Sequence, residues 1–288
     1  MKRNLNSGRS KIGILWLASM IVVLLFTLLP IYIMIKYSFS DKASWSTGGK
    51  YPVPWWPFEP TLENFVYYLS DRRFWSNALM SVKIALLAVA MCIVLGVPAA
   101  YSFARHKFPA SAVLLFLLVA VRMIPDVSAA VPVAKIFASN EVVRGFSAEL
   151  KIAIAHCLFG LPYMIFVTQG VFETIPVDLD EQAYILGASK PYAFIRIVLP
   201  LAVPAIASAS IYVFNLSWNE FLYAYYITNS SLSTTTPLAV YMKGLFGISS
   251  PSPVQLSLIS LIVSVPVIIF TFITQKYIVA GMTEGSVK

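Results

Sequence analysis

Amide and aromatic side chains recur within the apolar run IYVFNLSWNEFLYAYYI. Asn215, Asn219 and Tyr223 are four residues apart, so they would line one stripe of a continuous helix. Trp218 and Glu220 flank this stripe. Amides hydrogen-bond hydroxyl groups and aromatic rings stack on the apolar face of a sugar, so the stripe suits a carbohydrate pathway. Hydrogen bonding between helices of a bundle is the competing interpretation.

Charged residues in a second apolar region form another candidate. Arg122 and Asp126 are four residues apart and would share one face of a helix, where they can pair. Charges at membrane depth usually face a bundle interior or water, which makes this pair a candidate part of a transport pathway. A structural ion pair at the outer interface is an equally good interpretation.

The motifs of common enzymes are missing from the sequence. It contains no G-x-x-x-x-G-K-[ST] phosphate loop, no H-E-x-x-H and no G-x-S-x-G. His106 and His156 are its only histidines, so neither a metal site nor a Ser-His-Asp arrangement has support. We therefore expect a protein that is not an enzyme and that binds no metal. If it moves a solute uphill, the energy does not come from ATP bound to this chain.

The elements that position these residues are membrane spans. The chain of 288 residues is 58% hydrophobic and only 12% charged, well outside the usual composition of soluble proteins. A span needs roughly 20 mostly apolar residues, and long gaps between charged residues satisfy this. We predict an all-α, polytopic membrane protein with six transmembrane helices, at about residues 12–36, 78–104, 108–131, 151–173, 200–227 and 254–276.

Basic residues set the expected orientation. The N-terminal tail, residues 1–11, carries cations without any acid, which favours a cytoplasmic N-terminus. Six spans within the transmembrane domain, residues 12–278, then place the C-terminal tail, residues 279–288, on the same side. The formal net charge of +8 is therefore a topology signal, with lipid headgroups as its counter-charge, and gives no evidence for nucleic acid.

A polar segment interrupts the later spans, and we place it in a cytoplasmic loop at residues 174–199. Its sequence from Glu181 is EQAYILGASKPYAFIRIVLP. Gly187 can end or bend a first short helix, and Ser189 can cap a second one. We expect a helical elbow that docks in a groove on a cytosolic partner.

The first helix of this elbow is expected to carry a small apolar face and several acids in its first turns. Leu179, Ala183 and Leu186 would share one small apolar face. Asp178, Asp180 and Glu181 occupy the first turns, where the helix dipole favours acids.

The elbow resembles the cytoplasmic loop of permease subunits in binding-protein-dependent ATP-binding-cassette (ABC) importers. Its pattern is E-A-A-x(3)-G-x(9)-I-x-L-P, and the matching residues are Glu181, Ala183, Gly187, Ile197, Leu199 and Pro200, with Gln182 as a departure. The stretches PTLENF, LGVPAAYSFAR, WNEFLYA, TPLAV and QKYIVAGMTEGSVK are similar to the MalG-type branch of carbohydrate permeases. The resemblance extends over nearly the whole chain.

The resemblance implies the type I importer permease fold and a transport function. The chain would move a sugar, oligosaccharide or polyol across a bacterial or archaeal cytoplasmic (inner) membrane. Its partners would be a second, homologous permease, two copies of a cytosolic ATPase that hold ATP and Mg, an extracytoplasmic solute-binding protein and membrane lipids. The chain itself would bind no cofactor. A permease for a non-sugar solute and an ion-coupled secondary transporter are the alternatives.

The resemblance also assigns roles to residues. It implies coupling to the ATPase through Glu181, Ala183, Gly187, Leu199 and Pro200, with the three elbow acids suited to a basic rim on the ATPase. It also implies that the C-terminal tail, at Gly281, Met282 and Thr283, contacts the ATPase.

Overall fold

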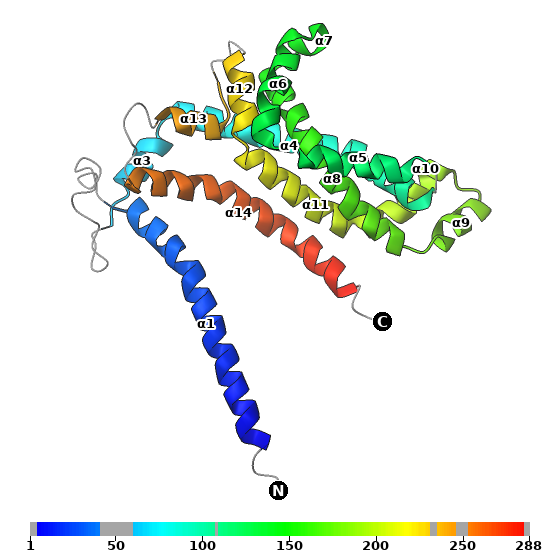
Figure 1. The fold of residues 1–288 in the computed structure, drawn as a ribbon, viewed down its shortest axis with the longest axis horizontal. Coiled ribbons are helices and arrows are strands. Elements are labelled where there is room, and N and C mark those ends of the chain that lie inside the picture. Colours follow the sequence, from blue (N-terminus) through cyan, green and yellow to red (C-terminus); the bar gives the residue numbers. More distant parts are fainter. Residues whose placement is uncertain (1–4, 41–59, 107–108, 231–234, 246–252, 285–288) are drawn as a thin grey trace. The chain divides into compact units, whose positions relative to one another are not determined.

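The structure is a computed structural model that describes residues 5–40, 60–106, 109–230, 235–245 and 253–284. All regular elements in these ranges are helices (Figure 1). The chain forms two compact units. One contains Met1–Asp71 and Phe246–Val265, and the other contains Arg72–Leu245 and Pro266–Lys288.

The first unit is built from α1 (Leu5–Ser38), α3 (Glu63–Leu69) and the beginning of α14 (Pro253–Glu284). The most apolar 18-residue window of α1, within Trp16–Ser38, has a mean hydropathy of 2.5 and buries no side chain inside the protein, which suits a helix surrounded by lipid. The helix begins at Leu5, so the described part of the expected N-terminal tail is helical.

The core of the second unit is the packing of α4 (Arg72–Arg105), α8 (Ala148–Thr174) and α11 (Leu199–Asn219). Two glycines allow these helices to approach closely. A Cβ at Gly96 would lie 2.9 Å from Met164 Cγ, and one at Gly160 would lie 3.1 Å from Val213 Cγ1. The three helices therefore form a tightly packed scaffold.

Within the described ranges, five helices are long and apolar enough to cross a membrane, or six if a bent pair is one span. The bent pair is α5 (Ser111–Met123) and α6 (Asp126–Ser139), whose axes differ by 101°. Ile124, which precedes Pro125, is extended with ψ 122°, as expected because a proline disfavours helical backbone before it. The expectation that Arg122 and Asp126 share one helix face is therefore wrong.

A second break follows α11. Glu220 is extended, with ψ 130°, and α12 (Leu222–Ser230) begins after it. Tyr223 therefore lies on a different helix from Asn215 and Asn219, and the predicted continuous stripe is wrong.

Short helices complete the second unit. The segment before α13 (Leu238–Leu245) is held on α4, because the amides of Thr236 and Leu238 donate to Asn77 Oδ1 and Ser81 Oγ at 3.0 and 2.7 Å. The other short helices are α7 (Glu141–Arg144), α9 (Asp178–Ile185), α10 (Lys190–Ala193) and the π-helical turn Phe194–Val198, which continues into α11.

Candidate functional site

The elbow consists of α9, a turn at Gly187, and α10, at one end of the second unit (Figure 1). Gly187 has a φ of +86°, and it is the one described residue with a left-handed backbone. The amide of Gly187 donates to Tyr184 O, and that of Ala188 donates to Ala183 O at 2.9 Å, a Schellman motif that closes α9. The predicted order of helix, bend and helix is confirmed.

A buried ion pair attaches the elbow to the scaffold. Arg105 Nε donates to Asp180 Oδ2 at 2.8 Å, and the two side chains are only 6% and 4% exposed. Arg105 Nη1 also donates to Phe172 O at 3.0 Å, and Tyr101 OH donates to Asp180 Oδ1 at 2.7 Å. These bonds join α9 to the ends of α4 and α8. Asp180 is therefore not an exposed acid for a partner's basic rim, and only Asp178 and Glu181 remain exposed.

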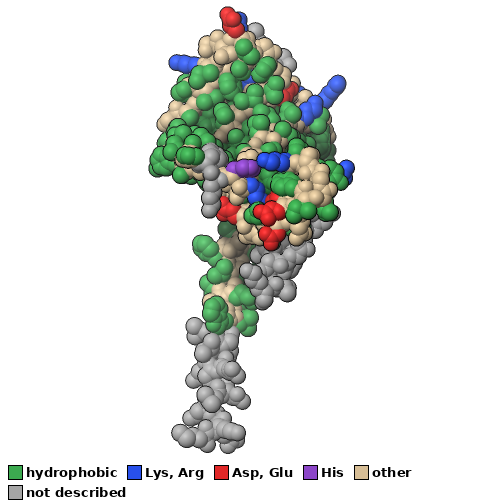
Figure 2. Space-filling view, turned by 90° about the vertical axis from the view of Figure 1, so that its right-hand side faces the viewer, with side chains coloured by type: hydrophobic (Ala, Val, Ile, Leu, Met, Phe, Trp, Pro, Cys, Tyr) green, Lys and Arg blue, Asp and Glu red, His purple; other side chains and the backbone are tan. Residues whose placement is uncertain are grey.

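The exposed tip of the elbow is apolar. Ile185 and Leu186 are 84% and 87% exposed, whereas Ala183 is buried. The expected shared face of Leu179, Ala183 and Leu186 is wrong, because Schellman closure turns the last residues of α9 outward while Ala183 packs inward. Figure 2 shows this end of the molecule, where acidic and basic side chains gather among hydrophobic ones.

The remaining residues of the expected coupling group lie on either side of this tip. Glu181 is exposed on α9, and Leu199 and Pro200 begin α11, half-buried and exposed respectively. Gly281, Met282 and Thr283 belong to the last turns of α14.

A second region lies at the other end of α11, where the two helix breaks meet around a pocket of about 350 Å³. Most of the expected pathway residues line it. They are Arg122, Asp126, Asn219, Glu220 and Tyr223.

Two of the expected pathway residues lie outside this pocket. Trp218 is buried and lies parallel to the Phe214 ring, with 6.1 Å between centroids. Asn215 is exposed on α11 and accepts a hydrogen bond from the Asn219 amide one turn later.

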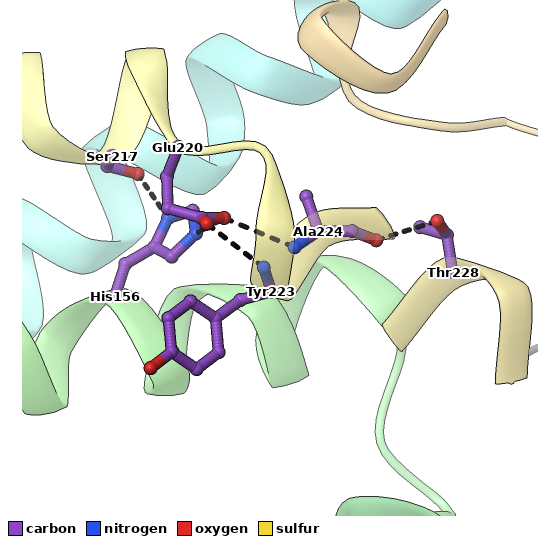
Figure 3. Close-up of polar contacts among 6 residues, drawn as sticks. All are labelled: His156, Ser217, Glu220, Tyr223, Ala224 and Thr228. Atoms are coloured by element: carbon purple, nitrogen blue, oxygen red, sulfur yellow. Dashed lines mark hydrogen bonds and ion pairs between the residues drawn. The ribbon is translucent and has the colours of Figure 1, made fainter. Parts of the chain in front are cut away.

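Glu220 organises the second break, as Figure 3 shows. Its carboxylate accepts from the amides of Tyr223 at 3.0 Å and Ala224 at 3.2 Å, which caps the start of α12. His156, from α8, places Nε2 3.1 Å from Glu220 Oε2 and Nδ1 2.7 Å from Ser217 Oγ. The histidine therefore bonds both to the end of α11, at Ser217, and to Glu220, which caps the beginning of α12.

The role of His156 was not predicted from the sequence. Its side chain is 1% exposed, and its partners follow it by 61 and 64 residues, so no local pattern connects them. The available signal was a lone histidine in an apolar run, which is compatible with many structural roles.

Tyr223 completes the pocket without a hydrogen bond from its hydroxyl. The residue is 1% exposed, and the hydroxyl has no partner among the described residues. The Tyr223 ring packs on Phe159, with 4.9 Å between centroids, and the Arg122 guanidinium carbon lies 5.8 Å from the Phe159 centroid. An aromatic surface and unused polar groups thus share one cavity.

Several proteins of similar sequence are named as permease proteins of transport systems. The chain is 28% identical over 274 residues to the trehalose transport system permease protein SugB of Mycobacterium tuberculosis, covering 95% of this chain and 97% of that protein. It is 32% identical to the sulfoquinovosyl glycerol transport system permease protein SmoH of Agrobacterium fabrum, covering 82% and 81%. It is 29% identical to the trehalose/maltose transport system permease protein MalG of Thermococcus litoralis, covering 96% of each.

A solved structure has the same fold. A chain from a bacterial ABC transporter involved in the import of the acidic polysaccharide alginate matches with a TM-score of 0.72, over 94% of this chain and 97% of that chain, at 21% identity. Residues 92–284 match the family model described as binding-protein-dependent transport system inner membrane component. The elbow and the apolar helices agree with this match, which extends over most of the chain. The chain therefore belongs to the family of binding-protein-dependent transport system inner membrane components.

Proposed function

We propose that this chain is the permease subunit of an ABC importer for a sugar, an oligosaccharide or a polyol. The observation that carries the proposal is similarity along almost the whole chain to permeases named for trehalose and for trehalose and maltose. The family membership supports a transporter component. The proposed location is the cytoplasmic membrane of a bacterium or archaeon, with both termini and the elbow on the cytoplasmic side.

The proposed partners supply what this chain lacks. Two copies of a cytosolic ATPase would hold ATP and Mg, a second homologous permease would complete the pathway, and a solute-binding protein would deliver the sugar. We propose that Ile185 and Leu186 enter a groove on one ATPase, since both are exposed apolar side chains beside the charged residue Glu181. Gly281, Met282 and Thr283 would contact the ATPase pair from the end of α14.

The elbow is proposed to transmit movement of the ATPase as a rigid body. When ATP binding closes the ATPase pair, each coupling elbow would move with its ATPase, and the permease halves would swing between inward-facing and outward-facing states. The Asp180–Arg105 pair supports this role, because a force applied to α9 reaches the ends of α4 and α8 through buried, charge-assisted hydrogen bonds.

Reconstitution in proteoliposomes tests the proposal. This chain, its second permease and its ATPase would be purified as one complex, and uptake of labelled trehalose and maltose measured with the binding protein. We expect uptake that requires both internal ATP and the binding protein. Uptake driven by an ion gradient without ATP would instead establish a secondary transporter and overturn the proposal.

A further inference from the structure

We propose that the pocket between the two helix breaks is a subsite for one uncharged sugar or polyol ring, which hydrogen-bonds to Tyr223, Asp126 and Arg122. This inference rests on the proposed sugar import and makes it more specific, because it assigns the ring to a place in this subunit and excludes acidic sugars from that place.

The arrangement of backbone supports a binding site. The break between α5 and α6 brings Arg122 and Asp126 to the pocket, and the break between α11 and α12 brings Glu220 and Tyr223. Interrupted helices at membrane depth are tolerated where they line a cavity, and transporters commonly build their sites at such interruptions. At about 350 Å³ the pocket lies near the lower end of the range of about 300–1,000 Å³ for small-molecule sites, so it suits one ring.

The Tyr223 hydroxyl is the most specific indication of a ligand. A buried polar group without a hydrogen bond costs about 1–3 kcal/mol, so native proteins rarely leave one unmatched. This hydroxyl has no partner among the described residues, and Tyr223 lines the same pocket as Asp126, Glu220 and Arg122. A hydroxyl group of a bound sugar can supply the missing partner, as donor or as acceptor.

The charges around the pocket favour an uncharged ligand. Glu220 is already committed, because its carboxylate bonds to His156 and to two amides of α12. Asp126 and Arg122 remain, and their charges are opposite. An anionic sugar would face two carboxylates for one guanidinium. In the described ranges, no group of three or more His, Cys, Asp or Glu side chains is arranged to hold a metal ion.

The aromatic surface in the pocket completes the match to a sugar. Phe159 and Phe221 both line it, and the apolar face of a sugar ring stacks on such rings while its edge hydroxyls find polar partners. The pocket also lies at the end of α11 away from the elbow, about 30 Å along a helix of this length. With the elbow in the cytoplasm, a sugar released by the binding protein would reach this end first.

The substitution Tyr223→Phe tests the subsite, with Tyr226→Phe as its matched control. Tyr226 lies one turn later on the same short helix and is exposed outside the pocket. Uptake of labelled trehalose and maltose would be measured with the complete reconstituted transporter, at equal amounts of complex. We expect Tyr223→Phe to lower the efficiency of uptake about 5- to 10-fold, the effect of losing one hydrogen bond, and Tyr226→Phe to match the wild type.

A merely structural hydroxyl would give another result. The Tyr223 hydroxyl bonds to no described residue, so without a ligand its removal would leave uptake unchanged. A wild-type rate of uptake by Tyr223→Phe therefore overturns the subsite, while the proposed sugar import stands.

The substitution Asp126→Asn tests the charge argument. It leaves Arg122 unbalanced, so the purified complex without the binding protein should bind glucuronic acid at least about 5-fold more tightly relative to glucose, measured by displacement of labelled trehalose. An unchanged ratio, or a wild-type transporter that imports acidic sugars better than neutral ones, overturns the preference for an uncharged ring. Absence of any ATP-dependent sugar uptake by the wild type would overturn both the proposed function and the subsite.

Discussion

The elbow and the pocket lie at opposite ends of α11, and they use charged side chains in different ways. At the elbow, Asp180 and Arg105 are almost fully buried and bond to each other, and the exposed tip carries Ile185 and Leu186. At the pocket, Arg122 and Asp126 are exposed around the cavity, whereas Glu220 bonds to His156 and to two amides of α12.

This difference separates a mechanical role from a binding role. Charges that satisfy each other inside the protein fix one element on another, whereas charges that remain around a cavity are available to a ligand. We therefore expect substitution of Asp180 or Arg105 to destabilise the attachment of the elbow. Substitution of Arg122 or Asp126 should instead change which ligand the pocket binds.

The largest effect is expected for Asp180→Leu, which leaves the buried Arg105 guanidinium without its carboxylate. Breaking such a pair from one side costs about 3–5 kcal/mol. Amide hydrogen exchange along α9 should accelerate strongly, and ATP-dependent uptake should be lost. Asp178→Leu, at an exposed neighbour, is the control and should leave exchange unchanged.

The double variant Asp180→Leu/Arg105→Met sharpens this result. Replacing both partners by apolar side chains removes the uncompensated charge, so it should be less destabilising than the single variant. Equal rates of amide hydrogen exchange along α9 in the single and double variants would mean that the ion pair does not attach the elbow to α4 and α8.

A smaller effect is expected for His156→Leu, at the pocket end. The change removes the bonds to Glu220 and Ser217, which costs about 1–3 kcal/mol for buried polar groups. Exchange should accelerate at the first amides of α12 and stay unchanged in α9. The exposed His106→Leu is the control, and a spread of the effect into α9 would contradict the separation of the two regions.

The smallest effect is expected for Gly187→Ala. Nothing lies within 4 Å of a Cβ at this position, so the cost is conformational alone, about 1–2 kcal/mol for a left-handed residue with a side chain. Gly187→Asn should cost less, because asparagine tolerates this backbone better. Thermal unfolding of the purified complex measures both, and equal stability of all three proteins would indicate that the turn does not require glycine.

Several helices were predictable because local sequence determines them. Long charge-free runs indicated the spans, and Gly187 indicated the bend in the elbow. The two breaks were missed for different reasons. Pro125 after Ile124 was a signal for the break between α5 and α6. The break between α11 and α12 depends on hydrogen bonds from amides of the next turn to Glu220, and the helical spacing of Asn215, Asn219 and Tyr223 gave no indication of it.

The supporting bonds of both regions were not predictable from one sequence. Asp180 and Arg105 are 75 residues apart, and only the packing of α4 beside α8 brings them together. The same packing hides Ala183, which the sequence alone placed on an exposed apolar face. Residue type therefore indicated the chemistry at each end, but the fold decided which side chains are exposed.

Site-specific photo-cross-linking at Leu186 tests whether the elbow tip docks on an ATPase. Leu186 would be replaced by p-benzoylphenylalanine in the purified complex, with Val142, exposed on α7, replaced as the control. We expect irradiation to join this chain to the ATPase from position 186 and not from position 142. No adduct at position 186, or equal adducts from both positions, would contradict it.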